Sequence, residues 1–331
     1  MPPGRAACRI LFDCFFCRVL LYCRQTEVWF MKKFLCAVVM LMLVFSFPAQ
    51  AKVQPLGSAG LLSEPHLLIS IYIQTEECEW DRTAMVYTRY ALSQAVDYVE
   101  GIGDQCGKEI RLITALDDPD LEFTMTYNTA MHDSAESSGY RFSQAVHAFI
   151  QDNIPQEELL RRHKAAGIGY LFLLPGEGCA YAMPFYLGDS MEWFYEYAVL
   201  YAYDIFAPGI YESPSAYAHE ILHLFGAPDL YIPYRPDGVT HDLVQFVDSL
   251  MYQELMYDTY EPNGDIRLHG ISQYVSEITL YCLGLIDDTV FLDLFPSLRR
   301  EYPGAFGASV QPGSWREYDC MQDDCWVCDY D

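Results

Sequence analysis

The chain has 331 residues, enough for one large domain or two small ones, and its hydrophobic fraction of 52% is ample for a packed core. It is strongly acidic, because 46 Asp and Glu face 20 Lys and Arg, for a formal net charge of −26. A chain of this charge repels phosphate backbones and anionic lipid surfaces, so we expect no nucleic-acid partner and attribute the acidity to solubility outside the cell.

The first predicted element is a secretory signal peptide at residues 31–51. Two lysines follow Met31, an apolar run occupies 34–47, and the small-residue sequence Ala-Gln-Ala ends at Ala51. These are the three parts of a signal peptide, and the apolar run is short for a membrane span. We therefore expect cleavage after Ala51 and a secreted, monomeric protein without a stable membrane anchor. Residues 1–30 are interpreted as an extension from a mis-assigned start codon, or else as part of a two-part leader.

Beyond the signal peptide, apolar periodicity predicts alternating strands and helices in a single α/β domain at 52–300, followed by an acidic, cysteine-containing tail at 301–331. Gly101 and Gly103 are expected to stop the first helix, and a turn at 117–120 to join the second and third strands. The predicted strands are 66–74, 109–116, 121–128, 168–175, 179–186 and 196–203, and the predicted helices are 83–100, 141–152, 155–165, 214–225 and 271–284.

The stretch SPSAYAHEILHLFGAPDLY, residues 213–231, carries the most specific chemistry in the chain. Residues four apart share one face of a helix, so His219 and His223 can each place one imidazole nitrogen on a single Zn²⁺. Glu220 lies beside the first ligand, where its carboxylate can take a proton from a zinc-bound water and later pass it to the leaving amine. The alternative is an ordinary amphipathic helix whose histidines contact only core or solvent.

A catalytic zinc needs a third protein ligand and one open coordination position. Gly226 can end the helix in a left-handed turn, and Pro228 prevents the helix from resuming. The chain then swings round, so that Asp229 can bring a carboxylate oxygen to the same metal. Glu277, on the last predicted helix, is the alternative third ligand.

The other candidate groups have simpler interpretations. His241 and His269 lie in polar loop sequence and are interpreted as solvated, and His66 precedes a strand and has no partner in view. The turn Asn263-Gly264-Asp265 could contact Ca²⁺, but two oxygen-bearing side chains are typical of an ordinary turn, so calcium has no further support. The three cysteines of the tail favour a local Cys325–Cys328 disulfide, or pairing of the tail with the body of the protein, over a second zinc site.

The sequence HEILHLFGAPDLY resembles the extended motif of the metzincin zinc endopeptidases, in the variant where Asp replaces the last His. It is similar to secreted bacterial metallopeptidases of the immune inhibitor A type, whose motif likewise continues G-x-P-D-x-Y. The resemblance implies one catalytic zinc at His219, His223 and Asp229, with Glu220 as the general base.

A methionine turn beneath the metal is also implied by this resemblance. Met256 is preferred to Met251, because the stretch at 271–288 resembles the segment that follows the turn in that group. Tyr257 is a candidate for stabilising the oxyanion, although the familiar pattern places this tyrosine one residue later.

The fold implied by the resemblance is a single metzincin-like catalytic domain. It would have a mixed, mainly parallel twisted sheet, an active-site helix and a mostly helical C-terminal subdomain after the methionine turn. One of the strands at 179–186 or 196–203 would border the cleft and pair with an extended peptide substrate.

The function implied by the resemblance is that of a secreted zinc metallopeptidase. Its rivals are a silent binding protein of the same fold, which the intact Glu220 disfavours, and a zinc hydrolase acting on bonds other than peptides.

Overall fold

The computed structural model places every described residue in one compact unit, Val53–Asp331. The predicted signal peptide, the upstream extension and the acidic tail lie outside the described residues. Among the helices of the described part, none is long and apolar enough to cross a membrane. The described residues are 62, 64–75, 79–127, 140–183, 195–234 and 237–299.

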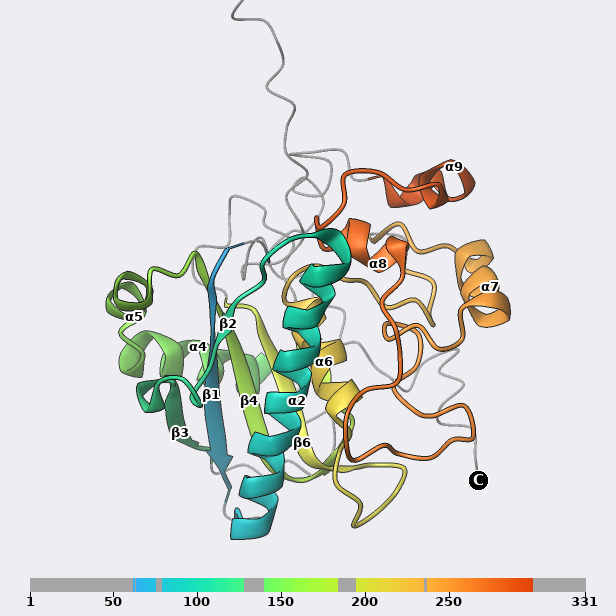
Figure 1. The fold of residues 1–331 in the computed structure, drawn as a ribbon. Coiled ribbons are helices and arrows are strands. Elements are labelled where there is room, and N and C mark those ends of the chain that lie inside the picture. Colours follow the sequence, from blue (N-terminus) through green and yellow to red (C-terminus); the bar gives the residue numbers. More distant parts are fainter. Residues whose placement is uncertain are drawn as a thin grey trace, which may run out of the picture. The chain divides into compact units, whose positions relative to one another are not determined.

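A mostly parallel sheet lies at the centre of the described fold (Figure 1). Its strands pair in the order β2-β1-β4-β6-β5, with β3 also paired to β1. Every pairing among these strands is parallel except that of β5 with β6, so the edge strand β5 runs against the others. The prediction of an α/β fold with a mainly parallel sheet is confirmed. The strands are β1 (His66–Gln74), β2 (Leu112–Ile113), β3 (Glu122–Thr126), β4 (Gly167–Gly178), β5 (Tyr181–Met183) and β6 (Tyr197–Asp204).

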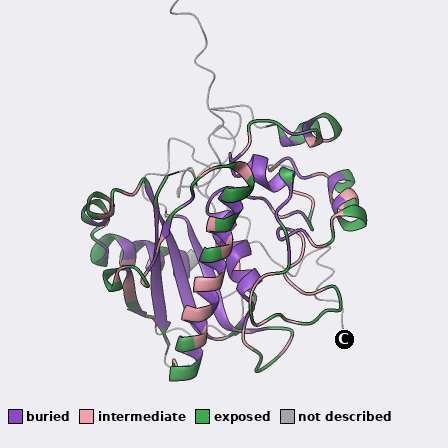
Figure 2. Ribbon diagram, viewed as in Figure 1, coloured by how far each residue is buried: buried purple, intermediate pink, exposed green. Residues whose placement is uncertain are grey.

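Helices cover both faces of the sheet, which explains why its central strands are apolar along nearly their whole length (Figure 2). On one face, Leu68 of β1 joins a buried cluster with side chains of α2 and α6. On the other face, Ile69 joins a cluster with α4 and α5. The helices α4 and α5 agree with prediction to within about two residues. The four helices are α2 (Arg82–Cys106), α4 (Tyr140–Asn153), α5 (Gln156–His163) and α6 (Pro214–His223).

Helix α2 continues through Gly101 and Gly103, so the prediction that these glycines stop it is wrong. It ends at Gly107, whose φ of 62° is left-handed and whose amide donates to Asp104 O. Gly103 is required by close packing rather than by a helix end. A Cβ at Gly103 would lie 2.3 Å from the carbonyl oxygen of Lys108, where the chain turns back along the helix.

The two glycines provide a matched test of this packing. We expect Gly103→Ala to lower the free energy of unfolding by about 1–3 kcal/mol, because the added methyl group meets backbone atoms. A Cβ at Gly101 meets nothing within 4 Å. Gly101→Ala should therefore raise the free energy of unfolding by about 0.5–1 kcal/mol, since alanine is the better helix former. Urea unfolding compares the two variants, and equal effects would contradict the close approach at Gly103.

The second and third predicted strands are shorter than expected and form one interrupted edge. Strand β2 pairs with His66 and Leu67, and β3 pairs with the later part of β1, both in parallel. Between them the chain leaves the sheet through a turn at Thr114 and a 3₁₀ helix, η1 (Pro119–Leu121). The predicted turn therefore does not reverse the chain, because both strands already run in the direction of β1.

The C-terminal part contains a helix that was not predicted, α7 (His241–Leu250), which begins at the N-cap Thr240. Helix α8 (Glu277–Cys282) is shorter than the predicted 271–284. The residues before α8 are held in a bridge instead, since Tyr274 pairs with Glu254 in parallel and its carbonyl accepts from Leu255 N at 2.8 Å. The chain continues through α9 (Phe291–Leu294) and the 3₁₀ helix η3 (Pro296–Leu298).

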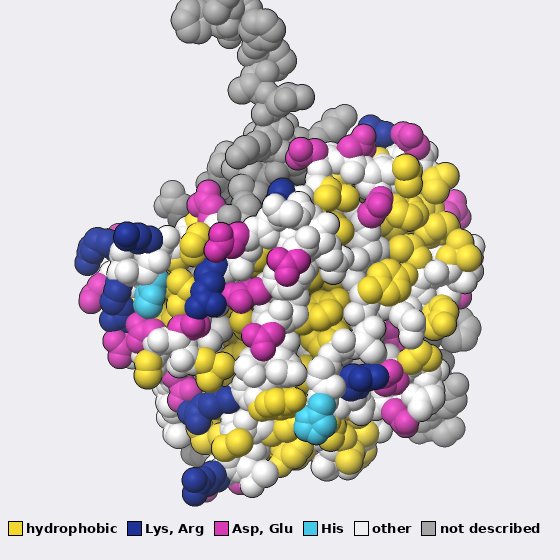
Figure 3. Space-filling model, in the orientation of Figure 1, with side chains coloured by type: hydrophobic (Ala, Val, Ile, Leu, Met, Phe, Trp, Pro, Cys, Tyr) yellow, Lys and Arg dark blue, Asp and Glu magenta, His cyan; other side chains and the backbone are white. Residues whose placement is uncertain are grey.

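Charged side chains are distributed unevenly over the face that Figure 3 shows. Acidic side chains are spread across it, whereas many basic ones gather around α5. There Arg162 forms ion pairs with Asp118 and Asp120 at 2.8 and 2.9 Å. Among the described residues, no Lys or Arg forms an ion pair with Glu220 or Asp229.

Candidate metal centre

Helix α6 carries the first part of the site and follows its predicted limits closely. The Ser213 hydroxyl accepts from the Ala216 amide at 3.0 Å, and Pro214 occupies the first turn. All ten residues of the helix are buried, because it packs against the sheet and against α2. After His223 the chain turns through Gly226, whose φ of 96° is open to glycine and unfavourable for other residues.

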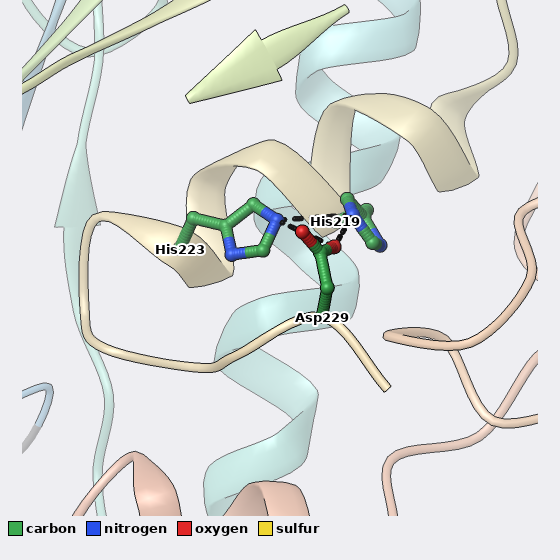
Figure 4. A group of neighbouring side chains, drawn as sticks. All are labelled: His219, His223 and Asp229. Carbon is green, nitrogen blue, oxygen red and sulfur yellow. Dashed lines mark hydrogen bonds and ion pairs between the residues drawn. The ribbon is translucent and has the colours of Figure 1, made fainter. Parts of the chain in front are cut away.

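This turn brings Asp229 back onto the two histidines of α6 (Figure 4). Asp229 Oδ1 lies 3.2 Å from Nε2 of both His219 and His223, and the two nitrogens are 3.0 Å apart. Within the described ranges, these are the side chains grouped closely enough to hold a metal ion. Glu277, the alternative ligand, is exposed at the start of α8 and accepts from the Thr289 hydroxyl at 2.7 Å. The structure therefore places Asp229, not Glu277, with the histidines.

Backbone carbonyls determine which nitrogen of each ring faces the cluster. His219 Nδ1 lies 3.0 Å from Leu255 O, and His223 Nδ1 lies 2.7 Å from Ala227 O. A carbonyl oxygen only accepts hydrogen bonds, so each Nδ1 carries a proton and donates it. Both Nε2 atoms are thereby left to face Asp229. Two ring lone pairs and a carboxylate oxygen at these distances repel one another unless a cation or a proton lies between them.

The electrostatics of the cluster favour positive charge at its centre. Burial lowers the pKa of His223, but Asp229 and Glu220 outweigh this effect and the net pKa is raised. Burial alone would raise the pKa of Asp229, yet the two histidines hold it well below its usual range. Asp229 is therefore ionised, which is the form in which a carboxylate binds a metal.

Glu220 lies among these residues without joining the ligand group. Its side chain is buried, with the residue 6% exposed, and its Oε2 atom has no hydrogen-bond partner. Burial raises the pKa of Glu220, and the neighbouring His219 and His223 partly offset the rise. Because a buried carboxylate oxygen without a donor costs free energy, this atom calls for a functional explanation. It is suited to accept a proton from a water molecule held at the cluster.

The predicted methionine turn contacts two of the ligand-bearing segments. Met256 is fully buried, and its carbonyl accepts from Leu230 N at 2.8 Å, next to Asp229. The preceding carbonyl, of Leu255, holds the ring of His219. Met251, the other candidate, is the C-cap residue of α7.

The tyrosine near the cluster is not the expected one. The Tyr257 hydroxyl donates to the Asp248 carboxylate on α7, so the structure does not bring it to the histidines. Tyr231, the last residue of the motif, for which no role was predicted, is 49% exposed and stacks near His219, with ring centroids 6.4 Å apart and planes at 28°. Its position two residues after Asp229, on the same turn, was the signal that could have identified it.

The remaining candidates lie apart from the cluster. His66 is fully buried, with Nδ1 2.7 Å from Glu64 O, as expected of a core histidine. His269 Nδ1 lies 3.1 Å from the Tyr90 hydroxyl. The turn at 263–265 is closed by its own side chains, since Asn263 Nδ2 donates to Asp265 Oδ2 at 2.6 Å. That closure is typical of an ordinary turn, which does not favour the calcium site.

The donor set of the cluster fits zinc. Two neutral imidazole nitrogens and one carboxylate oxygen are typical zinc ligands, and three protein ligands leave a position open for substrate. Calcium prefers six to eight oxygen ligands, which this cluster does not offer. The carbonyls of Leu255 and Ala227 also supply the outer hydrogen bonds that metal-binding histidines ordinarily make.

No family model matches this chain, and no curated protein matches it significantly. Among solved structures, the chain is similar to metalloproteinase-II from Bacteroides fragilis, with 12% sequence identity and a TM-score of 0.36. The match covers 73% of this chain and 59% of that one, so the chain spans less than two thirds of that protein's length. A likeness at this level assigns no activity, which has to be argued from the site itself.

Proposed function

We propose that this chain is a secreted, zinc-dependent metallopeptidase. The observation that carries the proposal is the convergence of His219 Nε2, His223 Nε2 and Asp229 Oδ1, whose ligand atoms all lie within 4.8 Å of one another. The histidine rings are oriented in advance by backbone carbonyls. A zinc ion held by these three residues would supply a Lewis acid for the scissile carbonyl and would lower the pKa of a bound water towards neutrality.

Glu220 supplies the proton transfers in this proposal. Its buried, unpartnered Oε2 accepts a proton from the attacking water and then delivers that proton to the leaving amine. Burial favours this exchange, because it raises the pKa of Glu220 above that of an exposed carboxyl group. Because Oε2 is shielded from bulk solvent, the proton that it accepts comes from the reacting water and not from other water molecules.

The edge strand β5 is the feature that favours a peptide as substrate. It pairs antiparallel with β6, packs near α6 and forms one edge of the sheet among the described strands. An exposed strand edge can add an extended peptide through main-chain hydrogen bonds, which would lay the substrate beside the metal centre. A binding protein without turnover remains the rival, and the buried, unpartnered Oε2 atom of Glu220 is the observation against it.

The proposal is tested first by the metal content of the purified protein beginning at Lys52, beside a His223→Ala variant. We expect about one zinc per chain in the first protein and loss of that zinc in the variant, because removal of one imidazole breaks the three-ligand set. Elemental analysis after zinc supplementation gives the stoichiometry, and circular dichroism shows whether both proteins are folded. A folded protein that takes up no zinc would end the proposal.

A further inference from the structure

A buried carboxylate that takes no part in the proposed chemistry lies behind the methionine turn. Glu254 is 0% exposed, and no Lys or Arg forms an ion pair with it among the described residues. A charge buried without a counter-ion is costly unless its oxygens receive several hydrogen bonds. The sequence alone does not indicate this role, since Glu254 belongs to no motif and is a single charged residue in the mainly apolar stretch SLMYQELMY.

Four donors converge on this carboxylate from two segments of the chain. Glu254 Oε1 accepts from the Ser276 amide at 3.1 Å, the Ser276 hydroxyl at 3.2 Å and the Thr279 hydroxyl at 2.5 Å. Glu254 Oε2 accepts from the Met256 amide at 2.5 Å. The side chain therefore ties the turn to the N-terminus of α8, where Ser276 is the N-cap residue.

The Met256 amide connects this carboxylate to the metal centre. That N–H and the Leu255 carbonyl belong to one planar, trans peptide unit, so they point in opposite directions. The Leu255 carbonyl accepts from His219 Nδ1 at 3.0 Å. A continuous path thus runs from the Glu254 carboxylate through one peptide unit to the imidazole, and His219 Nε2 at its far end faces Asp229.

We propose that Glu254 is a positioning residue for the metal centre, acting on His219 through the peptide unit between Leu255 and Met256. This inference rests on the proposed function, because it assigns Glu254 a role in zinc binding. Burial raises the pKa of Glu254, but four donors face its two oxygens, an arrangement that favours the ionised carboxylate. Negative charge beside the amide strengthens the carbonyl as an acceptor, as in other hydrogen-bonded chains. The carbonyl in turn holds the proton on Nδ1 and makes Nε2 the better ligand, the role that outer carboxylates play directly for metal-binding histidines.

The same turn fixes the backbone beside the third ligand. The Met256 carbonyl accepts from Leu230 N at 2.8 Å, and Leu230 directly follows Asp229. Glu254 therefore helps to position two of the three candidate ligands, His219 and Asp229, by fixing the backbone of Met256. Loss of its charge should disturb His219 most, because the hydrogen-bonded path ends on that ring.

The test is zinc affinity, measured by competition with a chelating dye, together with imidazole ¹⁵N spectra of the metal-free protein. We expect Glu254→Gln to weaken zinc binding by about 10- to 100-fold, the usual effect of losing an outer partner. Its His219 signals should lose the signature of a ring protonated only on Nδ1. Glu122→Gln is the matched control. Glu122 lies on strand β3, where its carboxylate accepts hydrogen bonds from Arg89, and the variant should keep the zinc affinity and the His219 spectrum of the parent protein.

Thr279→Val covers the case in which Glu254→Gln fails to fold. It removes one donor from Oε1 and leaves the charge in place, so we expect a smaller loss of about three- to tenfold in affinity. A lower melting temperature with unchanged zinc affinity and unchanged His219 spectrum would show a structural role only and would overturn the inference. If the parent protein binds no zinc, the proposed function fails, and the His219 spectra of the metal-free variants still decide whether Glu254 orients that ring.

Discussion

Glu220→Gln is expected to lower kcat/KM for a cleaved peptide by about 10³-fold while zinc binding is unchanged. The amide is nearly isosteric with the carboxylate but cannot take a proton from water or return one to the leaving amine. Glu220 is not among the clustered ligand atoms, so its replacement removes no bond to the metal. The measurement pairs steady-state kinetics on a peptide substrate with the zinc content of the same sample.

The control for this substitution is Glu261→Gln. Glu261 accepts hydrogen bonds from Arg267 and Ser272 in a loop and should show kinetics close to those of the parent protein. Near-normal turnover by zinc-loaded Glu220→Gln would remove the general base from the mechanism. Zinc binding without any peptidase activity in the parent protein would instead favour the rival interpretation, a binding protein that keeps the metal.

Asp229→Ala is expected to weaken zinc binding by more than about 100-fold, since loss of a direct ligand should exceed the effect of losing an outer partner. The variant also leaves His219 and His223 without the carboxylate that raises their pKa values. Protons then compete less well for the rings, but two nitrogens alone hold zinc weakly. Chelator competition at fixed pH measures the change.

Glu277→Ala separates the two candidates for the third ligand. Glu277 bonds Thr289 and lies outside the cluster, so its removal should leave zinc affinity within about twofold of the parent protein. If Glu277→Ala abolishes zinc binding while Asp229→Ala does not, the ligand assignment is wrong. A comparable loss in both variants would point to a change of fold, which circular dichroism would reveal.

The sequence was most informative where the chemistry depends on short spacing. His219 and His223 lie four residues apart, and 3.6 residues per turn places them on one face of any helix. Ser213 and Pro214 set the start of that helix, and the turn at Gly226 allows Asp229 to return, so the cluster in Figure 4 follows from local rules. The apolar strands were likewise predictable, because helices on both faces require them to be apolar throughout.

Local rules failed where a distant segment decided the conformation. A nearer contact explains Gly103, which was expected to end α2: the helix continues to Cys106, and the Lys108 carbonyl, five residues on, leaves no room for a Cβ there. Residues 271–276 have a helical pattern, but Tyr274 pairs with Glu254 in a parallel bridge and the helix begins only at Glu277. Tyr257 matched the family pattern approximately, and its hydroxyl is directed instead to Asp248.

By itself, therefore, the sequence determined the α/β class, the helix that carries His219 and His223, and the three residues that converge on the candidate zinc site. Only the tertiary structure decided which groups support them: the Leu255 carbonyl on His219, the Glu254 carboxylate behind it and Tyr231 beside the cluster. The physical reason is the range of each interaction. Helix periodicity and glycine turns act over a few residues, whereas the hydrogen bond from His219 to Leu255 joins residues 36 apart and depends on how the whole domain packs.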